Sequence, residues 1–331
     1  MEMPRFPPSG SRGITMISTR GAGRPVTAYA GSVCGRYAAS RRPDDLVEEF
    51  EIEATDGLGP GADPASAAPD FNVAPTKKAL VVLERVPRDA PRDAPAEGAD
   101  ASAAEAVADA AEQAPAAPLR WLRLLRWGLV PSWSKNASGG ARMINARAET
   151  LLDKPAFRRA TLTRRCLIPA DGWYEWQASP SEKDARGKPR KQPFFMHPVD
   201  GGPIAFAGVY ELWRDPAVPA DGPDAWLATY AIVTTGAESG LAAVHDRMPM
   251  VLPPDRWDGW LDPQQRDPDA VRALLAPPEE GRFAAVPVST RVNAVADNGP
   301  ALVDPLPREE WRGVLDPETG ELVGAGGAAL F

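Results

Sequence analysis

Proline and glycine punctuate this chain so often that its apolar runs stay short. The 331 residues include 37 prolines and 29 glycines. Proline interrupts helices and central strands, and glycine weakens the interior of either element. Short apolar runs bounded by turn residues are typical of buried strands. The sequence therefore predicts an irregular, β-rich α+β domain.

The apolar runs and proline-led acidic turns locate the expected elements. Buried strands are predicted at 79–83, 166–169, 204–210 and 227–233. Short helices are predicted at 43–50, 255–261 and 267–275. The first of these helices begins with a proline and two aspartates, which suit the positive end of a helix dipole.

Two segments have a composition unlike the rest of the chain. Residues 1–33 are rich in Gly, Ser, Pro and Arg, and residues 87–118 form an Ala, Pro, Asp and Glu tract. Such compositions bury too little apolar surface to fold, so we expect both to be disordered. We interpret the tract as a loop expansion inside one domain, 34–310, because lengthening an exposed loop costs little free energy. Residues 311–331 are expected to be a C-terminal tail, and the glycine-rich run at 324–327 within it is expected to be flexible.

Composition argues against several classes of protein. Hydrophobic residues make up 44% of the chain and charged residues 25%, as in soluble globular proteins. No apolar run reaches the roughly 18 residues of a membrane helix, and residues 1–33 lack the apolar core of a secretory signal. We therefore expect a cytoplasmic protein with reduced Cys34 and Cys166, the latter a buried thiol. Neither His197 nor His245 has a metal-ligand spacing with a cysteine, so no metal and no cofactor are predicted.

Charge is distributed unevenly along the chain. The net charge is −8, and the tract 87–118 alone contributes −5. Segment 119–165 carries eleven Lys and Arg side chains against two carboxylates, a net of +9. It also contains Trp121, Trp127 and Trp133, and basic surfaces with aromatic rings bind single-stranded nucleic acid. The alternative is that these tryptophans lie in the core and the arginines are merely solvated.

Cys34, in the run Val-Cys-Gly-Arg-Tyr at 33–37, has unusual chemistry only if its backbone nitrogen is a free amine. A terminal cysteine carries an amine and a thiol on adjacent carbons, and the two can close a five-membered ring on an aldehyde. An internal cysteine cannot do so. Residues 1–33 are therefore either absent from the working protein or incompatible with this chemistry.

Six motifs occur in a fixed order along the chain. They are CGRY at 34–37, FNVAPT at 71–76, RWGLVPSW at 126–133, INARAET at 144–150, CLIPADGWYEW at 166–176 and HDRMP at 245–249. In this order they closely resemble the SOS response-associated peptidase (SRAP) family, the abasic-site processing proteins. The likeness covers about 34–310, apart from 87–118.

The resemblance implies an α+β domain with a bifurcated β-barrel-like core. It also implies covalent capture of abasic sites in single-stranded DNA, which shields the lesion during the DNA damage (SOS) response. The implied enzyme class combines DNA–protein crosslinking with (auto)peptidase, hydrolase or lyase-type activity. The implied partner is single-stranded DNA that contains an abasic site, and a monomer is the simplest expectation for the protein itself.

The chain departs from the family pattern at its beginning, because the family's cysteine directly follows the initiator methionine. One explanation is that Val33 is encoded by a GTG start codon and that residues 1–32 precede the true start. The other is that the protein itself cuts the bond between Val33 and Cys34. Both routes leave Cys34 as the first residue.

The resemblance, with the chemistry of the side chains, assigns four catalytic residues. The Cys34 amine attacks the open-chain aldehyde of the abasic sugar, and its thiol then closes a thiazolidine. Glu175 moves protons on the amine and the sugar if Tyr174 and Trp176 exclude water and raise its pKa. His245 protonates the departing ring oxygen, and Asn145 holds the Cys34 amine or the sugar hydroxyls.

The resemblance also assigns a group of DNA-binding residues. Arg147 and Arg247 are expected to clamp the phosphates on either side of the lesion. The remaining expected pocket and strand-binding positions are Arg36, Pro75, Arg126, Trp127, Trp176 and Thr234. Asn72 is interpreted as a structural, turn-forming asparagine, and His197 as a histidine hydrogen-bonded in a loop.

Two other functions stay open at this point. A cysteine peptidase that uses Cys34, Glu175 and His245 would turn over peptide substrates and tolerate an N-terminal extension. A simple single-stranded DNA-binding module would use the surface of 119–165, and its salt-sensitive binding would not need Cys34.

Overall fold

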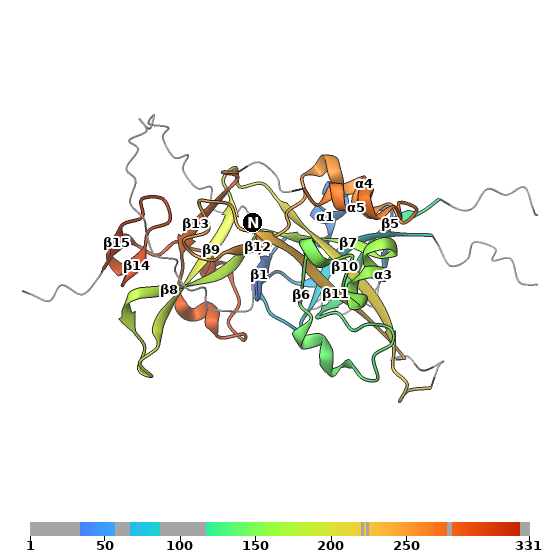
Figure 1. Ribbon diagram of the computed structural model, residues 1–331, viewed down its shortest axis with the longest axis horizontal. Helices are drawn as coiled ribbons and strands as arrows, with labels where there is room; N and C mark the ends of the chain where they lie inside the picture. The colour runs from blue at the N-terminus through green and yellow to red at the C-terminus, as the bar shows by residue number, and fades with distance from the viewer. Residues whose placement is uncertain are drawn as a thin grey trace, which may run out of the picture.

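The computed structural model describes residues 34–56, 67–86, 117–219, 222, 225–276 and 280–324 (Figure 1). Residues 1–33 and nearly all of the predicted loop expansion at 87–118 lie outside the described residues. Among the residues that are described, none of the helices has the length and apolarity that a membrane crossing requires. The same part of the chain contains no cluster of His, Cys, Asp and Glu side chains suited to a metal ion.

Five strands close into a barrel. In spatial order they are β4 (Lys78–Arg85), β5 (Leu119–Trp127), β11 (Trp226–Gly236), β10 (Ile204–Arg214) and β7 (Arg165–Ala170). Neighbours pair antiparallel except for β5 and β11, whose parallel pairing completes the ring. The four strands predicted from apolar runs all lie in this barrel, and the predicted β-rich α+β fold with a barrel core is confirmed.

Short strands extend the barrel at β5 and β11. β2 (Ala54–Asp56) runs parallel to β5, β6 (Asn145–Arg147) runs parallel to β11, and β12 (Arg247–Pro249) runs antiparallel to β11. Two stretches that are distant in sequence, around 145–147 and 245–249, therefore meet on the same barrel strand.

A second sheet departs from the barrel, so the core is bifurcated. Its strands, in spatial order, are β13 (Phe283–Pro287), β9 (Pro189–Pro198), β8 (Gly172–Lys183), β1 (Arg36–Ala39) and β3 (Asp70–Val73). All neighbours are antiparallel.

The chain passes from the barrel strand β7 to β8 through Asp171 alone. The Asp171 N–H donates to the Ala38 carbonyl at 2.8 Å, which ties this junction to β1. A Cβ on the next residue, Gly172, would lie 2.3 Å from the Met196 carbonyl oxygen. Only glycine allows β9 to approach the junction this closely.

Within the residues that the structure describes, the helices are few and short. The α-helices are α1 (Pro43–Glu49), α3 (Pro155–Thr163), α4 (Trp257–Leu261) and α5 (Pro268–Leu274). The 3₁₀ turns are η2 (Ala137–Arg142), η3 (Ala148–Thr150), η4 (Pro254–Arg256), η5 (Thr290–Asn293), η6 (Pro300–Leu302) and η7 (Arg308–Glu310). The three predicted helices correspond to α1, to η4 with α4, and to α5. Helix α3 was not predicted, because its apolar residues are few and arginines occupy its middle.

The helices α1, α4 and α5 lie together over one face of the barrel (Figure 1). Phe50, at the end of α1, stacks on Trp257 of α4 with ring centroids 4.5 Å apart. Arg165 of β7 holds the C-terminal end of α4, because its buried guanidinium donates to the carbonyl oxygens of Trp260, Asp262 and Gln265.

Trp127 lies wholly inside the protein, which corrects its expected place on a DNA-binding surface. Its ring is 0% exposed and packs against Tyr37, with ring centroids 5.2 Å apart. Its indole N–H donates to the Ile144 carbonyl at 2.9 Å. A base cannot stack on a ring that is covered on all sides, so Trp127 belongs to the core.

The C-terminal tail expected at 311–331 has secondary structure over part of its length. Strands β14 (Val314–Leu315) and β15 (Leu322–Val323) form a hairpin. Val314 is wholly buried in the apolar cluster that also contains Cys34. The sequence did not predict this hairpin, because packing on distant strands stabilises it. Residues 325–331 lie outside the described residues.

Candidate functional site

Cys34 lies immediately before β1, in the buried centre of the protein. It is 0% exposed, and its backbone N–H donates to Glu175 Oε1 at 2.6 Å. The antiparallel pairing of β1 with β8, in which Arg36 faces Tyr174, brings these two residues together across 141 positions of sequence. Cys34 has a φ of +39°, an uncommon backbone conformation for a residue other than glycine.

Glu175 is a buried carboxyl on β8, with 2% of the residue exposed. Burial is the main reason that its pKa rises to about 8, and the nearby Asp246 carboxylate adds to the rise. The Cys34 N–H and the Lys191 ammonium act in the opposite direction. A carboxyl that titrates near neutral pH is suited to both accepting and returning a proton.

The rings beside Glu175 in sequence do not cover it as expected, because successive strand residues point to opposite faces. Tyr174 packs on Phe195, with ring centroids 5.1 Å apart, and donates to the Phe71 carbonyl at 2.8 Å. The indole N–H of Trp176 donates to Asn293 Oδ1 at 2.8 Å. Glu175 itself faces Cys34, so the burial that raises its pKa has a different source from the one predicted.

Asn145 contacts Cys34 from a strand that pairs with the barrel. Asn145 lies on β6, opposite Ile232 of β11. Its side-chain Nδ2 donates to the Cys34 carbonyl oxygen at 3.3 Å. The structure therefore brings Asn145 to the predicted partner residue, with the contact on the carbonyl oxygen.

His245 lies in the turn between β11 and β12. Its Nδ1 accepts the Arg247 backbone N–H at 3.1 Å and lies 3.2 Å from Asp246 Oδ1. Burial lowers the pKa of His245, while the Asp246 carboxylate partly offsets this effect. Because Nδ1 accepts the Arg247 N–H, the neutral imidazole carries its hydrogen on Nε2.

The Cys34 thiol has a pKa well above its usual range, first because it is buried and second because the Glu175 carboxylate is near. A thiol in this setting stays protonated near neutral pH. It reacts as a nucleophile only when a neighbouring base takes its proton.

Arg147 and Arg247 lie on either side of β11. Thr234 of β11 pairs with Arg147 of β6, and Gly236 pairs with Arg247 of β12. Arg147 is exposed. Arg247 makes a bidentate pair with Glu149, at 2.6 and 3.0 Å, and also donates to the buried Thr234.

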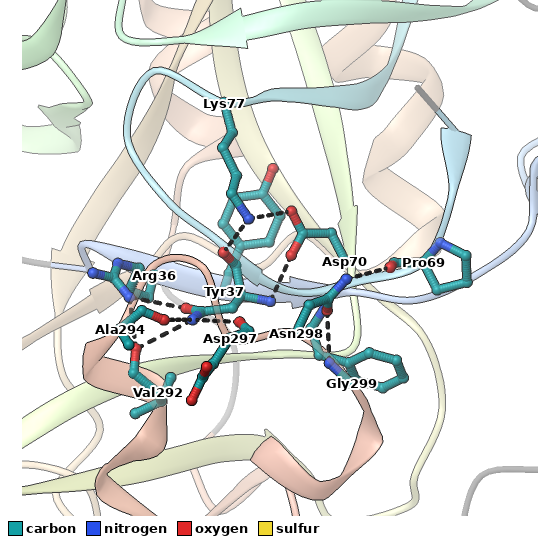
Figure 2. Close-up of polar contacts among 12 residues, drawn as sticks. Arg36, Tyr37, Pro69, Asp70, Lys77, Val292, Ala294, Asp297, Asn298 and Gly299 are labelled. Carbon is teal, nitrogen blue, oxygen red and sulfur yellow. Dashed lines mark hydrogen bonds and ion pairs between the residues drawn. The ribbon is translucent and has the colours of Figure 1, made fainter. Parts of the chain in front are cut away.

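Arg36 is half-buried, and its side chain points toward η5 (Figure 2). Its guanidinium donates to Asn72 Oδ1 at 2.9 Å and to the Val292 carbonyl at 2.7 Å. The amide of Asn72 in turn donates to the carbonyl oxygens of Val292, Ala294 and Asp297. Asn72 is structural, as predicted, but it holds a distant loop rather than a local turn.

The basic segment 119–165 combines structural and exposed cations. Arg120 pairs with Glu84 at 2.8 Å and Arg164 pairs with Glu211, while Arg165 is buried. The exposed members are Lys135, Arg142, Arg147, Lys154, Arg158 and Arg159. Arg126 and Pro75, two of the predicted strand-binding positions, are half-buried.

Trp133 is a candidate binding residue that the sequence analysis named with the other tryptophans of segment 119–165 but did not assign to the site. It follows β5 and is 70% exposed, whereas Trp127 in the same motif is wholly buried. The polar Ser132 and Ser134 on either side were the available signal. A large exposed ring among cations suits base stacking.

Comparison of the chain with known proteins identifies its family. The model of the SOS response associated peptidase (SRAP) family matches residues 33–295. The chain belongs to the SRAP family. The resemblance inferred from the ordered motifs is thereby confirmed.

The relatives of this SRAP protein are named for abasic sites. It is 33% identical over 273 residues to the abasic site processing protein YoqW of Bacillus subtilis. That alignment covers 82% of this chain and 99% of YoqW. It is 27% identical over 275 residues to the abasic site processing protein YedK of Escherichia coli, covering 83% of this chain and 100% of YedK. A solved structure from Bacteroides thetaiotaomicron, 18% identical, shares the fold with a TM-score of 0.59 and covers 82% of this chain and 100% of that one.

Proposed function

We propose that this protein captures abasic sites in single-stranded DNA covalently, through a thiazolidine that Cys34 forms as the first residue of the mature chain. The observation that carries the proposal is the 2.6 Å contact between the Cys34 nitrogen and Glu175 Oε1. When Cys34 is terminal, this nitrogen is an amine, and a buried proton acceptor lies against it. The names of the relatives support an abasic site as the substrate.

The first step opens the sugar. The C1′ hydroxyl of the abasic site loses its proton, the bond from C1′ to the ring oxygen breaks, and that oxygen takes up a proton, which leaves an aldehyde. The neutral His245 carries a hydrogen on Nε2 and is the proposed donor to the ring oxygen.

The second step forms an imine. The Cys34 amine bonds to C1′, and Glu175 takes the proton that the nitrogen releases. Glu175 returns this proton to the C1′ oxygen, which becomes a hydroxyl group. It then moves the second nitrogen proton to that hydroxyl, which leaves as water as the C1′–N double bond forms. Burial favours the protonated form of Glu175 and thereby supports the return of a proton to the substrate.

The third step closes the ring. The Cys34 sulfur bonds to C1′, the second bond of the imine becomes a nitrogen lone pair, and the thiol proton moves to that nitrogen. The overall change is one water released per crosslink. Asn145 holds the Cys34 carbonyl at 3.3 Å and thereby orients the amine and the thiol toward the same carbon.

The surrounding surface supplies the proposed DNA contacts. Arg147 on β6 and the exposed cations of 119–165 attract the phosphates, and Trp133 stacks on a base. Arg247 is proposed to release Glu149 when a phosphate arrives, since a carboxylate and a phosphate compete for the same bidentate donor. Trp176 remains a proposed strand-binding position, whereas the buried Thr234 is proposed to act by holding Arg247.

A denaturing gel tests the proposal. Protein that begins at Cys34 is incubated with a single-stranded oligonucleotide that contains one abasic site. We expect an adduct that survives denaturation and whose mass equals both partners less one water. Cys34→Ala abolishes it, whereas Cys166→Ala, at a buried thiol of the same core, leaves it intact.

The other functions give different results in the same experiment. A non-covalent binding module gives salt-sensitive binding that Cys34→Ala does not change, and no adduct on the gel. A peptidase turns over peptides. An adduct formed equally well by a chain that retains residues 1–33 would refute the thiazolidine, because an internal cysteine has no amine.

Either route of removal of the residues before Cys34 satisfies the proposed chemistry. Intact mass and N-terminal sequencing of the protein from its own cells give the mature N-terminus. A full-length chain expressed with a Glu175→Gln change separates the two routes: self-cleavage makes removal depend on this site, whereas a downstream start does not.

A further inference from the structure

The C-terminal hairpin packs on the strand that carries Glu175. Val314 of β14 is wholly buried, in the apolar cluster that also contains Cys34. The preceding Gly313 has a φ of +56°, and a Cβ there would lie 2.4 Å from Ser179 Oγ on β8. Arg190 of β9 also donates to the Arg312 carbonyl at 2.7 Å. The hairpin is therefore seated directly against β8 and β9, beyond the end of the matched family model at residue 295.

Gln177 is the polar link between β8 and this hairpin. It is 3% exposed, and it exchanges two hydrogen bonds with Leu315: its Oε1 accepts the Leu315 N–H at 2.8 Å, and its Nε2 donates to the Leu315 carbonyl at 2.8 Å. A side-chain amide that pairs with one residue in this way acts as a peptide group of a neighbouring strand would.

Gln177 also reaches the turn that carries His245. Its Nε2 donates to the Ala243 carbonyl at 3.2 Å. The turn is compact, because the His245 N–H donates to the Leu241 carbonyl at 3.2 Å and Leu241 and Val244 are buried with Val314. A shift of Ala243 would therefore move His245 with it.

Glu175 and Gln177 lie two positions apart on β8, so their side chains point to the same face. One strand thus holds the proposed proton acceptor directly and the His245 turn through a buried amide. The charged groups near both are shared, since Asp246 and Lys191 act on Glu175 and on His245.

We propose that Gln177 is a positioning residue: braced by the C-terminal hairpin at Leu315, it fixes the His245 turn relative to Glu175. This inference rests on the proposed function in one respect: the proposed function says why His245 and Glu175 need to be aligned. The alignment itself is a property of the free protein and is measurable without DNA.

The first test uses proton NMR. The chain has only two histidines, so the imidazole C–H signals number four, two from each ring, and His245→Ala assigns them. In Gln177→Leu we expect the turn to loosen and water to reach the ring, so the pKa of His245 rises toward its ordinary value while that of His197 is unchanged. Gln177→Glu keeps an acceptor for Leu315 but removes the donors to Ala243, and serves as a second variant if Gln177→Leu does not fold.

Gln192→Leu is the matched control. Gln192 is 1% exposed and pairs with Gln177 across β8 and β9. Its Nε2 donates to the carbonyl oxygens of Pro193, on β9, and of Val288, the residue after β13. Its Oε1 accepts from Arg190 at 3.0 Å, so Gln192→Leu also tests whether loss of that contact alone affects the His245 turn. We expect a comparable loss of stability and no change in the titration of His245.

The second test is a double-mutant cycle on the rate of crosslinking. Gln177→Leu should slow the reaction about ten-fold, a fraction of the roughly 10²–10⁴ that a positioned acid or base supplies. In a His245→Ala background it should have no further effect on the rate. Gln192→Leu should change the rate little in either background.

The outcomes separate the two proposals. If the His245 titration in Gln177→Leu matches that of wild type, the positioning role is refuted, whatever the gel shows. If the titration shifts but wild type forms no adduct, the positioning inference stands and the proposed function fails. Equal slowing by Gln177→Leu with and without His245 would also overturn the inference, since the effect would then be general destabilisation.

Discussion

The contact between Cys34 and Glu175 changes its nature with the chemical state of one nitrogen. In a chain that retains residues 1–33 this nitrogen is a neutral amide, and burial holds the pKa of Glu175 at about 8. In a chain that begins at Cys34 it is an amine, and its protonated form pairs with the carboxylate. The same fold therefore carries a buried, neutral acid in one form and a buried ion pair in the other.

This difference predicts how stability depends on pH. The pKa of Glu175 is raised from 4.5 in the unfolded chain to about 8, so between these values the folded state binds more protons. The free energy of unfolding of the chain with residues 1–33 should thus fall as pH rises from about 4.5 to about 8. Thermal unfolding across this window measures it.

Two variants check the assignment to Glu175. Glu175→Gln should flatten the loss of stability with pH, because the glutamine has no proton to release. The chain that begins at Cys34 should lose less stability over the same window, because its ammonium group favours the carboxylate. An unaltered pH slope in Glu175→Gln would assign the effect to other groups.

Arg147 and Arg247 should respond differently to removal. Arg147 is exposed, so Arg147→Ala should weaken binding of single-stranded DNA, reduce the slope of log affinity against log salt by about 0.7, and leave the unfolding temperature unchanged. Arg247→Ala also removes the contacts to Glu149 and Thr234 and should lower the unfolding temperature. Salt-dependent binding assays and calorimetry measure the two effects, and equal thermal losses would contradict this division.

Among the elements, β8 positions the site through its alternation. Glu175 and Gln177 face inward, while Tyr174 and Trp176 contact the opposite side. The sequence shows this alternation, but it does not show which face meets Cys34. The register of β1 on β8 makes that choice, and this register depends on the close approach of β9 at Gly172.

Gly172→Ala should therefore disrupt the junction of the two sheets. The added Cβ would lie 2.3 Å from the Met196 carbonyl oxygen and 2.5 Å from the Phe195 ring. A clash with backbone is not relieved by a rotamer change, so we expect a loss of about 3 kcal/mol or failure to fold.

Gly139→Ala is the control for this prediction, because a Cβ there meets nothing within 4 Å. Its free energy of unfolding should stay close to that of wild type. Urea unfolding of the two variants compares them, and similar midpoints would show that the junction tolerates a side chain.

At the scale of the whole molecule, the pairing of β4 with β5 explains why the chain tolerates a long insertion between these two strands. β4 and β5 pair along their full length, and Arg85 faces Leu119 at the end of the ladder. The two ends of the intervening segment are thus neighbours, and a short turn can join them. The free-energy cost of a longer connection grows only slowly with its length.

Replacing residues 88–115 with a four-residue glycine-rich turn should leave the fold and the proposed activity in place. We expect the unfolding temperature to stay within a few degrees of wild type, since shortening this connection changes the loop entropy by roughly 1–2 kcal/mol. Calorimetry and the crosslinking gel test this. A large loss of stability would mean that the segment packs on the barrel.

The sequence by itself determined the family, the barrel strands and most helices, because ordered motifs and short apolar runs are local patterns. Cys34, Asn145 and Glu175 were predicted together and lie in contact. What the aromatic and basic residues do was decided only by the tertiary structure. Trp127 is core while Trp133 is exposed, although both belong to one motif. The C-terminal hairpin and its link through Gln177 could likewise not be predicted from local composition. The reason is that burial and hydrogen-bond partners depend on contacts between strands that lie far apart in sequence.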